Sequence, residues 1–198
     1  MNKPISWTDS IDLMNSEKIK KLLSTDIEPH LESTNTKHAA VLIVIYGEEL
    51  KIIMTKKPLT MQQHAGEISF PGGKIDSEDQ DLLETAIRET REEIGLDIFR
   101  ESIVGQLSPV QTRNSGFTII PFIAVLNEIE SLQPNSEVDE ILHIPIFQLL
   151  ETLKEDDNPE HRSLFEAYQL TFENKLIWGA SARMLKQIAD IFEQNKLI

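Results

Sequence analysis

Residues 67–96 read EISFPGGKIDSEDQDLLETAIRETREEIGL, and this stretch decides how the rest of the chain is interpreted. Ile68 and Phe70 alternate with polar residues, which predicts a short strand. Gly72 and Gly73 then interrupt it, because adjacent glycines permit backbone angles and close approaches that other residues resist. A helix is expected after a polar loop. Its apolar residues, mostly at helical spacing, are Leu82, Leu83, Ala86, Ile87 and Ile94.

The expected helix has candidate caps at both ends. Ser77 or Asp79 could accept the unpaired N–H groups of its first turn. Gly95 stands where a helix commonly ends in a left-handed residue. The stretch therefore predicts a strand, a glycine turn, a loop and a helix.

Three glutamates lie on one face of this expected helix. Glu89, Glu92 and Glu93 occupy positions i, i+3 and i+4, so their carboxylates project from the same side. Such a cluster needs neutralisation, and carboxylate oxygens suit Mg²⁺ or Mn²⁺. The alternative is a solvated acidic face, softened by pairs such as Arg88 with Glu92. The double glycine favours the metal site, because backbone groups there could approach a metal-bound phosphate.

Residues 88–96, RETREEIGL, resemble the Nudix box. That pattern is Gly, five residues, Glu, seven residues, then Arg-Glu-aliphatic-X-Glu-Glu-X-Gly-aliphatic. Thr90 stands where the pattern has an aliphatic residue. The loop before the helix is one residue longer than the pattern, so the first Glu of the box falls on Gln80 and its glycine on Lys74. Candidate substitutes for that first glutamate are Glu78, Asp79 and Asp81.

The resemblance implies an α/β fold, namely a Nudix-type α/β/α sandwich with a mixed β-sheet. It also implies a hydrolase that uses Mg²⁺ or Mn²⁺ to cleave a diphosphate. The implied metal ligands are Glu89, Glu92, Glu93 and the carbonyl of Gly73.

The same resemblance assigns catalytic roles. Arg88 would orient the glutamates by ion pairing, and Glu93 or Glu89 would accept the proton of the attacking water. Glutamates in the region of Glu137 and Glu140 supply the base in some Nudix enzymes, so these two are secondary candidates. An exposed acidic turn is the alternative for that pair.

A second resemblance covers residues 55–73, TKKPLTMQQHAGEISFPGG. They resemble the extra motif of the coenzyme A diphosphatase branch, roughly Thr-X-Arg-Ser, Leu-Arg-X-His-X-Gly-Gln/Glu and Phe-Pro-Gly-Gly-X-X-Asp-X-X-Asp. Residues 177–182, IWGASA, resemble that branch's Ile-Trp-Gly-X-Thr-Ala segment. The matches to the first motif are Thr55, His64, Gly66, Glu67, Phe70, Pro71, Gly72, Gly73, Asp76 and Asp79. The departures are Lys57 for Arg, Pro58 for Ser, Met61 for Leu, Gln62 for Arg and, in the second segment, Ser181 for Thr.

This branch implies cleavage of coenzyme A or acyl-coenzyme A to 4′-phosphopantetheine and adenosine 3′,5′-bisphosphate. Lys57 and His64 are the candidate substrate contacts. One alternative is a diphosphatase for ADP-ribose or another nucleoside diphosphate derivative, because two arginines of the branch motif are missing. Another is a non-catalytic Nudix binding module, against which the presence of all three glutamates argues.

The composition of the chain limits which classes of protein and partner are possible. A chain of 198 residues without cysteine fits one soluble domain with no disulfide framework or cysteine nucleophile. The net charge of −14 argues against nucleic acid and anionic membranes as partners, but not against a small polyphosphate substrate. The coenzyme A-like diphosphate expected as the partner is what the resemblance implies. No signal-peptide pattern and no apolar run of about 20 residues is present, so a cytoplasmic protein is expected. A homodimer is left open.

The remaining pattern divides the chain at residue 37. Residues 1–36 are expected to form an N-terminal helical extension packed on the domain, with an amphipathic helix over residues 8–24. Residues 37–198 are the expected Nudix hydrolase domain. Within it, residues 39–46 predict a buried central strand and residues 116–126 a long strand that Pro121 would place at an edge or a bulge. Trp178 is interpreted as core, and residues 180–192 as a closing helix.

Overall fold

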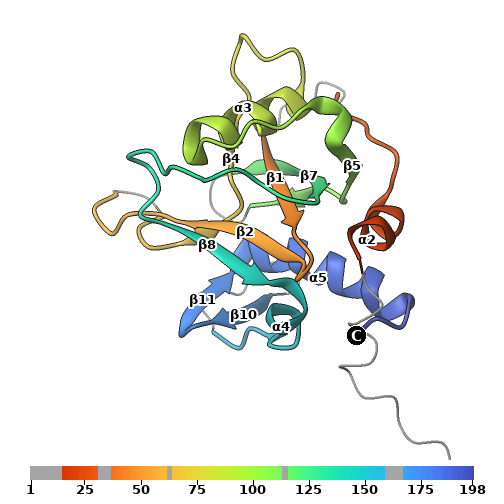
Figure 1. Ribbon diagram of the computed structural model, residues 1–198. Coiled ribbons are helices and arrows are strands. Elements are labelled where there is room, and N and C mark those ends of the chain that lie inside the picture. Colours follow the sequence, from red (N-terminus) through yellow and green to blue (C-terminus); the bar gives the residue numbers. More distant parts are fainter. Residues whose placement is uncertain (1–14, 31–36, 62–63, 113–115, 159–166) are drawn as a thin grey trace, which may run out of the picture.

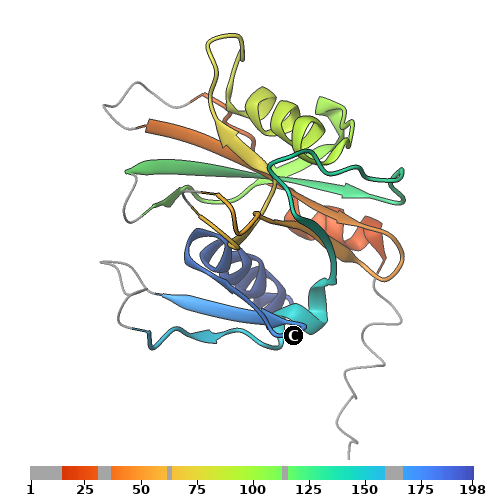
Figure 2. The same cartoon turned by 90° about the vertical axis from the view of Figure 1, so that its left-hand side faces the viewer.

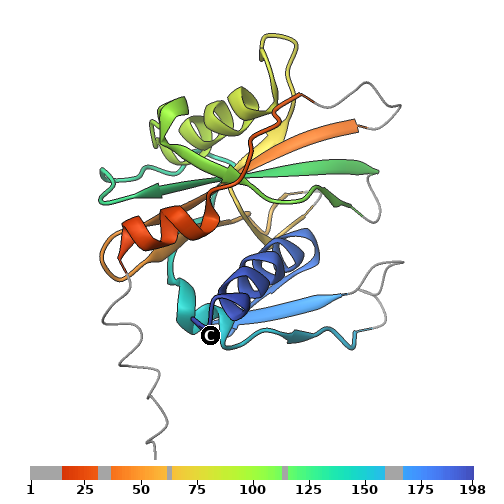
Figure 3. The same cartoon turned by 90° about the vertical axis from the view of Figure 1, so that its right-hand side faces the viewer.

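The computed structural model describes residues 15–30, 37–61, 64–112, 116–158 and 167–198. A mixed β-sheet lies between helices on its two faces (Figures 1, 2 and 3). Helix α3 covers one face, and α2 and α5 cover the other together with a small second sheet. The expected α/β/α sandwich with a mixed sheet is confirmed.

Two long strands form the centre of the main sheet. Strand β1 (Lys37–Tyr46) runs parallel to β7 (Phe117–Leu126) over their whole length. Most of their residues are buried, because helices cover both faces, and this explains the continuous apolar runs in both segments. Strands β5 (Ile103–Gln106) and β6 (Val110–Gln111) pair antiparallel with the far side of β7.

Pro121 was expected at an edge or a bulge, and the edge position is wrong. Pro121 lies inside β7, between β1 and the β5–β6 side. Its carbonyl accepts a hydrogen bond from the N–H of Leu107, which lies between β5 and β6. Because the nitrogen and carbonyl of one strand residue face the same side, the missing N–H of Pro121 faces this interruption and costs the β1–β7 ladder no bond.

The sheet splits between β1 and β2 (Lys51–Lys56). These strands pair only next to their connecting turn, through Ile45 with Ile52 and Tyr46 with Lys51. Farther along, β2 pairs with β3 (Ile68–Ser69) and, on its other side, with β8 (Glu140–Pro145). Beside β1 lies β4 (Gly72–Lys74). The chain from β3 to β4 therefore crosses the split.

The double glycine is consequently part of a strand, and the expected glycine turn is wrong. Gly72 and Gly73 pair with Val41 and Ala40 of β1. Gly72 has φ +153°, and a Cβ there would lie 2.3 Å from the carbonyl oxygen of Ala40. Only glycine allows the chain to pass this close to β1.

Helix α3 (Leu82–Ile94) follows the loop after β4. Its N-cap is Asp81, whose side chain accepts from the N–H of Glu84, so the caps expected at Ser77 or Asp79 are wrong. Gly95 ends the helix with φ +70°, as expected. Thr90, the departure from the aliphatic pattern, is fully buried, and its hydroxyl donates to the carbonyl of Ala86, which satisfies its polar group.

The opposite face carries the N- and C-terminal elements. Helix α2 (Ser16–Leu23) contacts β5, β7 and α5, and the part of the expected helix over residues 8–14 lies outside the described residues. The division into an extension and a domain stays a prediction. The other elements are η1 (Arg100–Ser102), α4 (Ile146–Leu150), β9 (Lys154–Glu155), β10 (Tyr168–Phe172), β11 (Lys175–Trp178) and α5 (Gly179–Gln194). Among the described residues, no helix is both long and apolar enough to cross a membrane.

Candidate active site

The backbone of Gly72 and Gly73 lies against two glutamates of α3. The N–H of Gly72 donates to Oε2 of Glu93 at 3.3 Å. A Cβ on Gly73 would lie 2.3 Å from Oε1 of Glu89, so this strand position has no room for a side chain. Strand β4 and helix α3, which the sequence separates by a loop, thus bring two carboxylates and two backbone units together.

Glu93 is the buried member of the cluster. Its side chain is 4 % exposed, and burial is the main cause that raises its pKa to about 7. The charge of Lys57 and the N–H of Gly72 act in the opposite direction and lower the pKa of Glu93. The charge of Lys57, the expected substrate contact directly after β2, therefore acts on this carboxylate.

Glu89 is partly buried beside it. Burial raises the pKa of Glu89, while its ion pair with Arg88 lowers it. The charge of Glu137 raises the pKa of both Glu89 and Glu93. The carboxylate of Glu140 instead lies 3.4 Å from Nζ of Lys175 on β11. Of the two secondary candidates for the base, Glu137 acts on the cluster, whereas Glu140 pairs with a lysine of β11.

Arg88 holds the outer side of the cluster together. Its Nη1 donates to Oε1 of Glu89 at 3.0 Å and to Oε2 of Glu92 at 3.1 Å. Its Nε and Nη2 donate to the two oxygens of Asp79 at 2.8 and 2.9 Å. Asp79 is 2 % exposed, and the hydrogen bonds from Arg88 are the main cause that lowers its pKa to about 2.

Among the three candidate substitutes for the first glutamate of the box, Asp79 is the partner of Arg88. Asp81 instead caps α3 and pairs with Arg100. Glu78 is exposed on the loop, where its backbone N–H donates to Asp76. Because Arg88 donates hydrogen bonds to both Asp79 and Glu89, its guanidinium joins the loop before α3 to the helix itself.

The oxygen atoms of the three glutamates and of the Gly73 backbone are suitable ligands for a hard divalent cation. The carboxylates do not, however, point to one common position. Across the described ranges, no group of three or more His, Asp or Glu side chains is arranged to hold a metal ion. Arg88 draws Glu89 and Glu92 toward itself, and Glu92 is 52 % exposed. A buried carboxylate at Glu93, however, has no ion pair among the described residues, and Gly73 adds a backbone carbonyl beside Glu89. Such oxygen ligands are those that Mg²⁺ and Mn²⁺ prefer.

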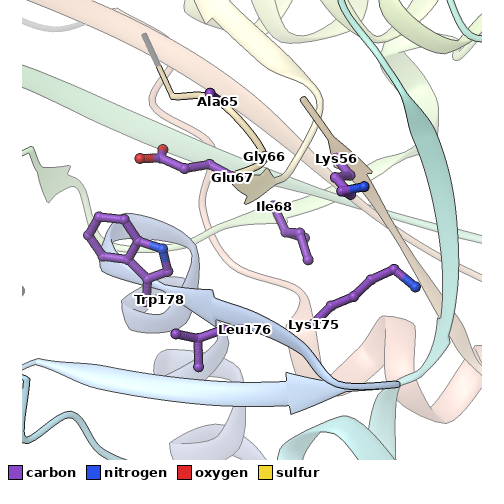
Figure 4. Close-up of a pocket in the computed structure, with 8 residues that line it drawn as sticks. All are labelled: Lys56, Ala65, Gly66, Glu67, Ile68, Lys175, Leu176 and Trp178. Carbon is purple, nitrogen blue, oxygen red and sulfur yellow. The ribbon is translucent and has the colours of Figure 1, made fainter. Parts of the chain in front are cut away.

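His64 lies away from this cluster. Its backbone has φ +59°, and its Nδ1 lies 2.7 Å from Oε2 of Glu67. Glu67 lines a cavity of about 340 Å³ together with residues of β11, including Trp178 (Figure 4). The interpretation of Trp178 as core is wrong, because its side chain is only partly buried and borders this pocket. The charge of Lys57 thus acts on Glu93, whereas His64 contacts Glu67, a residue of the pocket lining.

Replacing Arg88 with lysine is expected to lower kcat/KM by about 10- to 100-fold, the usual cost of losing a group that orients metal ligands. A lysine cannot reproduce the fork that joins Asp79 to Glu89 and Glu92. Steady-state kinetics of the purified variant measure the loss. Arg91→Lys, at an exposed position of the same helix, is the control and should stay within about twofold. Equal activity of both variants would refute the positioning role.

Comparisons with known proteins identify the family of this chain. The NUDIX domain model matches residues 36–168. An uncharacterized Nudix hydrolase, NudL, of Yersinia enterocolitica is 31 % identical over 178 residues, covering 88 % of this chain and 91 % of that protein. The NudL of Photorhabdus laumondii is 31 % identical over 169 residues, covering 81 % of this chain and 88 % of that protein.

Solved structures agree in fold. A MutT/nudix family protein from Enterococcus faecalis superposes with a TM-score of 0.57 at 14 % identity, covering 84 % of this chain and 66 % of that chain. The NUDIX domain of Shewanella oneidensis NrtR, solved with ADP ribose, has a TM-score of 0.55 at 13 % identity, covering 90 % and 98 %. With the matching domain model and the related hydrolases, the chain belongs to the Nudix family of hydrolases.

Proposed function

We propose that this protein uses Mg²⁺ or Mn²⁺ to hydrolyse the diphosphate bond of coenzyme A or acyl-coenzyme A. The products would be 4′-phosphopantetheine and adenosine 3′,5′-bisphosphate. The observation that carries the hydrolytic part is the contact of Glu89 and Glu93 with the backbone of Gly72 and Gly73, together with the charge of Lys57 that acts on Glu93. The substrate assignment rests on the resemblance of residues 55–73 and 177–182 to the coenzyme A diphosphatase branch.

Each group has a role in this proposal. Glu89, Glu92, Glu93 and the carbonyl of Gly73 would hold the cation, which supplies charge neutralisation for the diphosphate oxygens and acidifies a bound water. Lys57 lies close enough to Glu93 to affect its pKa, and its ammonium group would contact a phosphate oxygen there. Arg88 acts through Glu89 and Glu92 as a positioning residue.

The base that accepts the proton of the attacking water is Glu93 or Glu89 in this proposal. Water adds to one phosphorus of the diphosphate, the bridging P–O bond breaks, and each half leaves with a phosphate. Glu137, whose charge reaches both glutamates, is the secondary candidate for the base. Glu140, which pairs with Lys175, is the weaker of the two secondary candidates.

Phosphorus NMR of the reaction tests the proposal. The wild-type protein with Mg²⁺ or Mn²⁺ is mixed in turn with coenzyme A, acetyl-coenzyme A, ADP-ribose and ATP. We expect the diphosphate signals of coenzyme A to disappear and two new monophosphate signals to appear, while the 3′-phosphate is retained. The same sample with Glu93→Gln should leave coenzyme A intact. Persistence of coenzyme A with wild type, under conditions where another diphosphate is consumed, would refute the substrate assignment.

ADP-ribose is the second candidate substrate. Lys57 stands where the coenzyme A branch has an arginine, and the NrtR NUDIX domain of similar fold was solved with ADP ribose. Consumption of ADP-ribose alone in the NMR experiment would select this activity and keep the same catalytic cluster. If wild type consumes nothing with either metal, the protein is a Nudix binding module.

A further inference from the structure

The cavity beside Glu67 brings together two segments that are far apart in the sequence. One side is formed by the end of β2 and by Gly66 and Glu67, and the other by β11 (Figure 4). Both segments belong to the two stretches outside the Nudix box that resemble the coenzyme A diphosphatase branch or directly adjoin them. No residue of the Nudix box itself lines the cavity. Its position therefore suggests a role in choosing the substrate rather than in cleaving it.

The end of β2 connects this cavity to the catalytic cluster. Lys56 is the last residue of β2 and lines the cavity, and Lys57 follows it directly in the chain. The charge of Lys57 acts on Glu93 and lowers its pKa. The N–H of Lys57 also donates to the carbonyl of Glu67, a cavity residue, at 2.9 Å. This backbone hydrogen bond therefore joins a residue of the cavity lining to the lysine whose charge acts on Glu93.

The chemistry of the cavity wall is specific. The indole of Trp178 lies at one end and the ammonium groups of Lys56 and Lys175 lie at the other, as Figure 4 shows. Leu176 and Ile68 supply apolar surface between them. A planar base can stack on an indole, and ammonium groups contact phosphate oxygens. A phosphorylated nucleoside has these two parts at its two ends.

Lys56 and Lys175 can bind a phosphate even though each forms ion pairs with nearby carboxylates. Nζ of Lys175 lies 3.4 Å from Glu140 and 3.5 Å from Glu173, and Lys56 pairs with Asp139 at 3.0 Å. Asp139, Glu140 and Glu173 are 49 %, 41 % and 66 % exposed, and ion pairs to exposed carboxylates are weak. Each ammonium carries three N–H donors, so a phosphate can bind without the loss of both pairs.

We propose that this cavity binds the phosphorylated nucleoside half of the substrate, with the base on Trp178 and the phosphate that is not cleaved on Lys56 and Lys175. The inference deepens the proposed function and rests on it for the identity of the substrate. Lys56 and Lys175 would then be specificity residues for the 3′-phosphate, while the carboxylates of α3 cleave the diphosphate.

Tryptophan fluorescence tests the binding directly. The chain has two tryptophans, so Trp7→Phe leaves Trp178 as the only reporter. Adenosine 3′,5′-bisphosphate should quench Trp178, and 4′-phosphopantetheine should not. Lys175→Ala or Lys56→Ala should weaken the bisphosphate by about 10-fold, the loss expected for one charge-assisted hydrogen bond. Lys51→Ala, on the same strand and paired with Glu49, is the matched control and should not change the affinity. Absence of quenching, or equal quenching in all variants, would overturn the inference.

Kinetics separate this inference from the proposed function. Lys175→Ala should raise KM for coenzyme A by about 10-fold and leave kcat within about twofold, whereas KM for dephospho-coenzyme A, which lacks the 3′-phosphate, should not change. If coenzyme A is cleaved but its KM is unchanged in Lys175→Ala, the cavity inference fails and the proposed function stands. If the bisphosphate quenches Trp178 in a lysine-dependent way but coenzyme A is not cleaved, the cavity inference is supported and the proposed activity fails.

Discussion

Glu93→Gln is expected to lower kcat by about 10³-fold and, at the same time, to make the metal-free protein more stable above about pH 7. The activity falls because glutamine can neither accept a proton nor bind a cation with a full charge. The stability rises because burial disfavours the charged form of Glu93, whose pKa is raised to about 7. A neutral amide of nearly the same shape avoids that cost.

The sign of the pH dependence follows from this raised pKa. Between an unfolded pKa of about 4.5 and a folded pKa of about 7, the folded protein binds more protons than the unfolded one. The free energy of unfolding of the wild type should therefore fall, relative to that of Glu93→Gln, as the pH rises through this window. Above the window the difference between the two proteins should stay constant. The full difference is on the order of 3 kcal/mol, which corresponds to a shift of the melting temperature of roughly 5–10 °C.

Thermal unfolding with a chelator at pH 5 and pH 8 measures the effect. Glu93→Gln and wild type should melt at nearly the same temperature at pH 5 and differ at pH 8. Glu92→Gln, at an exposed carboxylate of the same helix, is the control and should not be stabilised at pH 8. A Glu93→Gln protein that melts at or below the wild-type temperature at pH 8 would contradict the conclusion that burial of the charged Glu93 destabilises the fold.

Gly73→Ala is expected to lower kcat by about 100-fold with little change in the melting temperature, because a displacement of about 1 Å at a catalytic group can cost that much. The added Cβ would lie 2.3 Å from Oε1 and 2.4 Å from Cδ of Glu89. The obstructing atoms are the end of a side chain, so Glu89 moves and the backbone stays. Gly73 also lacks the positive φ that would make alanine strained there.

A double-mutant cycle isolates this contact. In a Glu89→Ala background the obstruction is absent, so adding Gly73→Ala should change kcat by no more than about twofold. Steady-state rates of the two single variants and the double variant are compared with wild type. If the effects of Gly73→Ala and Glu89→Ala simply multiply, Gly73 acts independently of Glu89 and the proposed arrangement is wrong.

Local patterns in the sequence predicted the elements that depend on local physics. Helix α3 and its left-handed end at Gly95 follow from apolar spacing and from the freedom of glycine. The double glycine was placed wrongly in a turn, because its strand conformation depends on pairing with Ala40 and Val41, which lie more than thirty residues earlier. The N-cap of α3 was predicted at the wrong residue because it also depends on a tertiary contact. Asp79 accepts hydrogen bonds from Arg88, and Asp81 caps the helix instead.

The candidate site shows the same division. Helical spacing placed Glu89, Glu92 and Glu93 on one face, but it could not rank them. The tertiary structure ranks them, because the N–H of Gly72 donates to Glu93 and the charge of Lys57 acts on it, while Glu92 is about half exposed. The cavity was not predictable, because Trp178 lies more than one hundred residues from Glu67 and sits in a strand whose neighbours are also apolar, which hides its alternation.

Calorimetric titration of Mn²⁺ into the protein tests the central claim most directly, namely that the carboxylates beside Gly72 and Gly73 hold a divalent cation. Wild type should bind Mn²⁺, and Glu93→Gln should bind it at least about 10-fold more weakly, since even supporting groups of a metal site contribute that much. Glu67→Gln, which removes the carboxylate at the cavity rim, should bind as wild type does. Undetectable binding by wild type, or equal binding by wild type and Glu93→Gln, would contradict the metal site and the hydrolysis built on it.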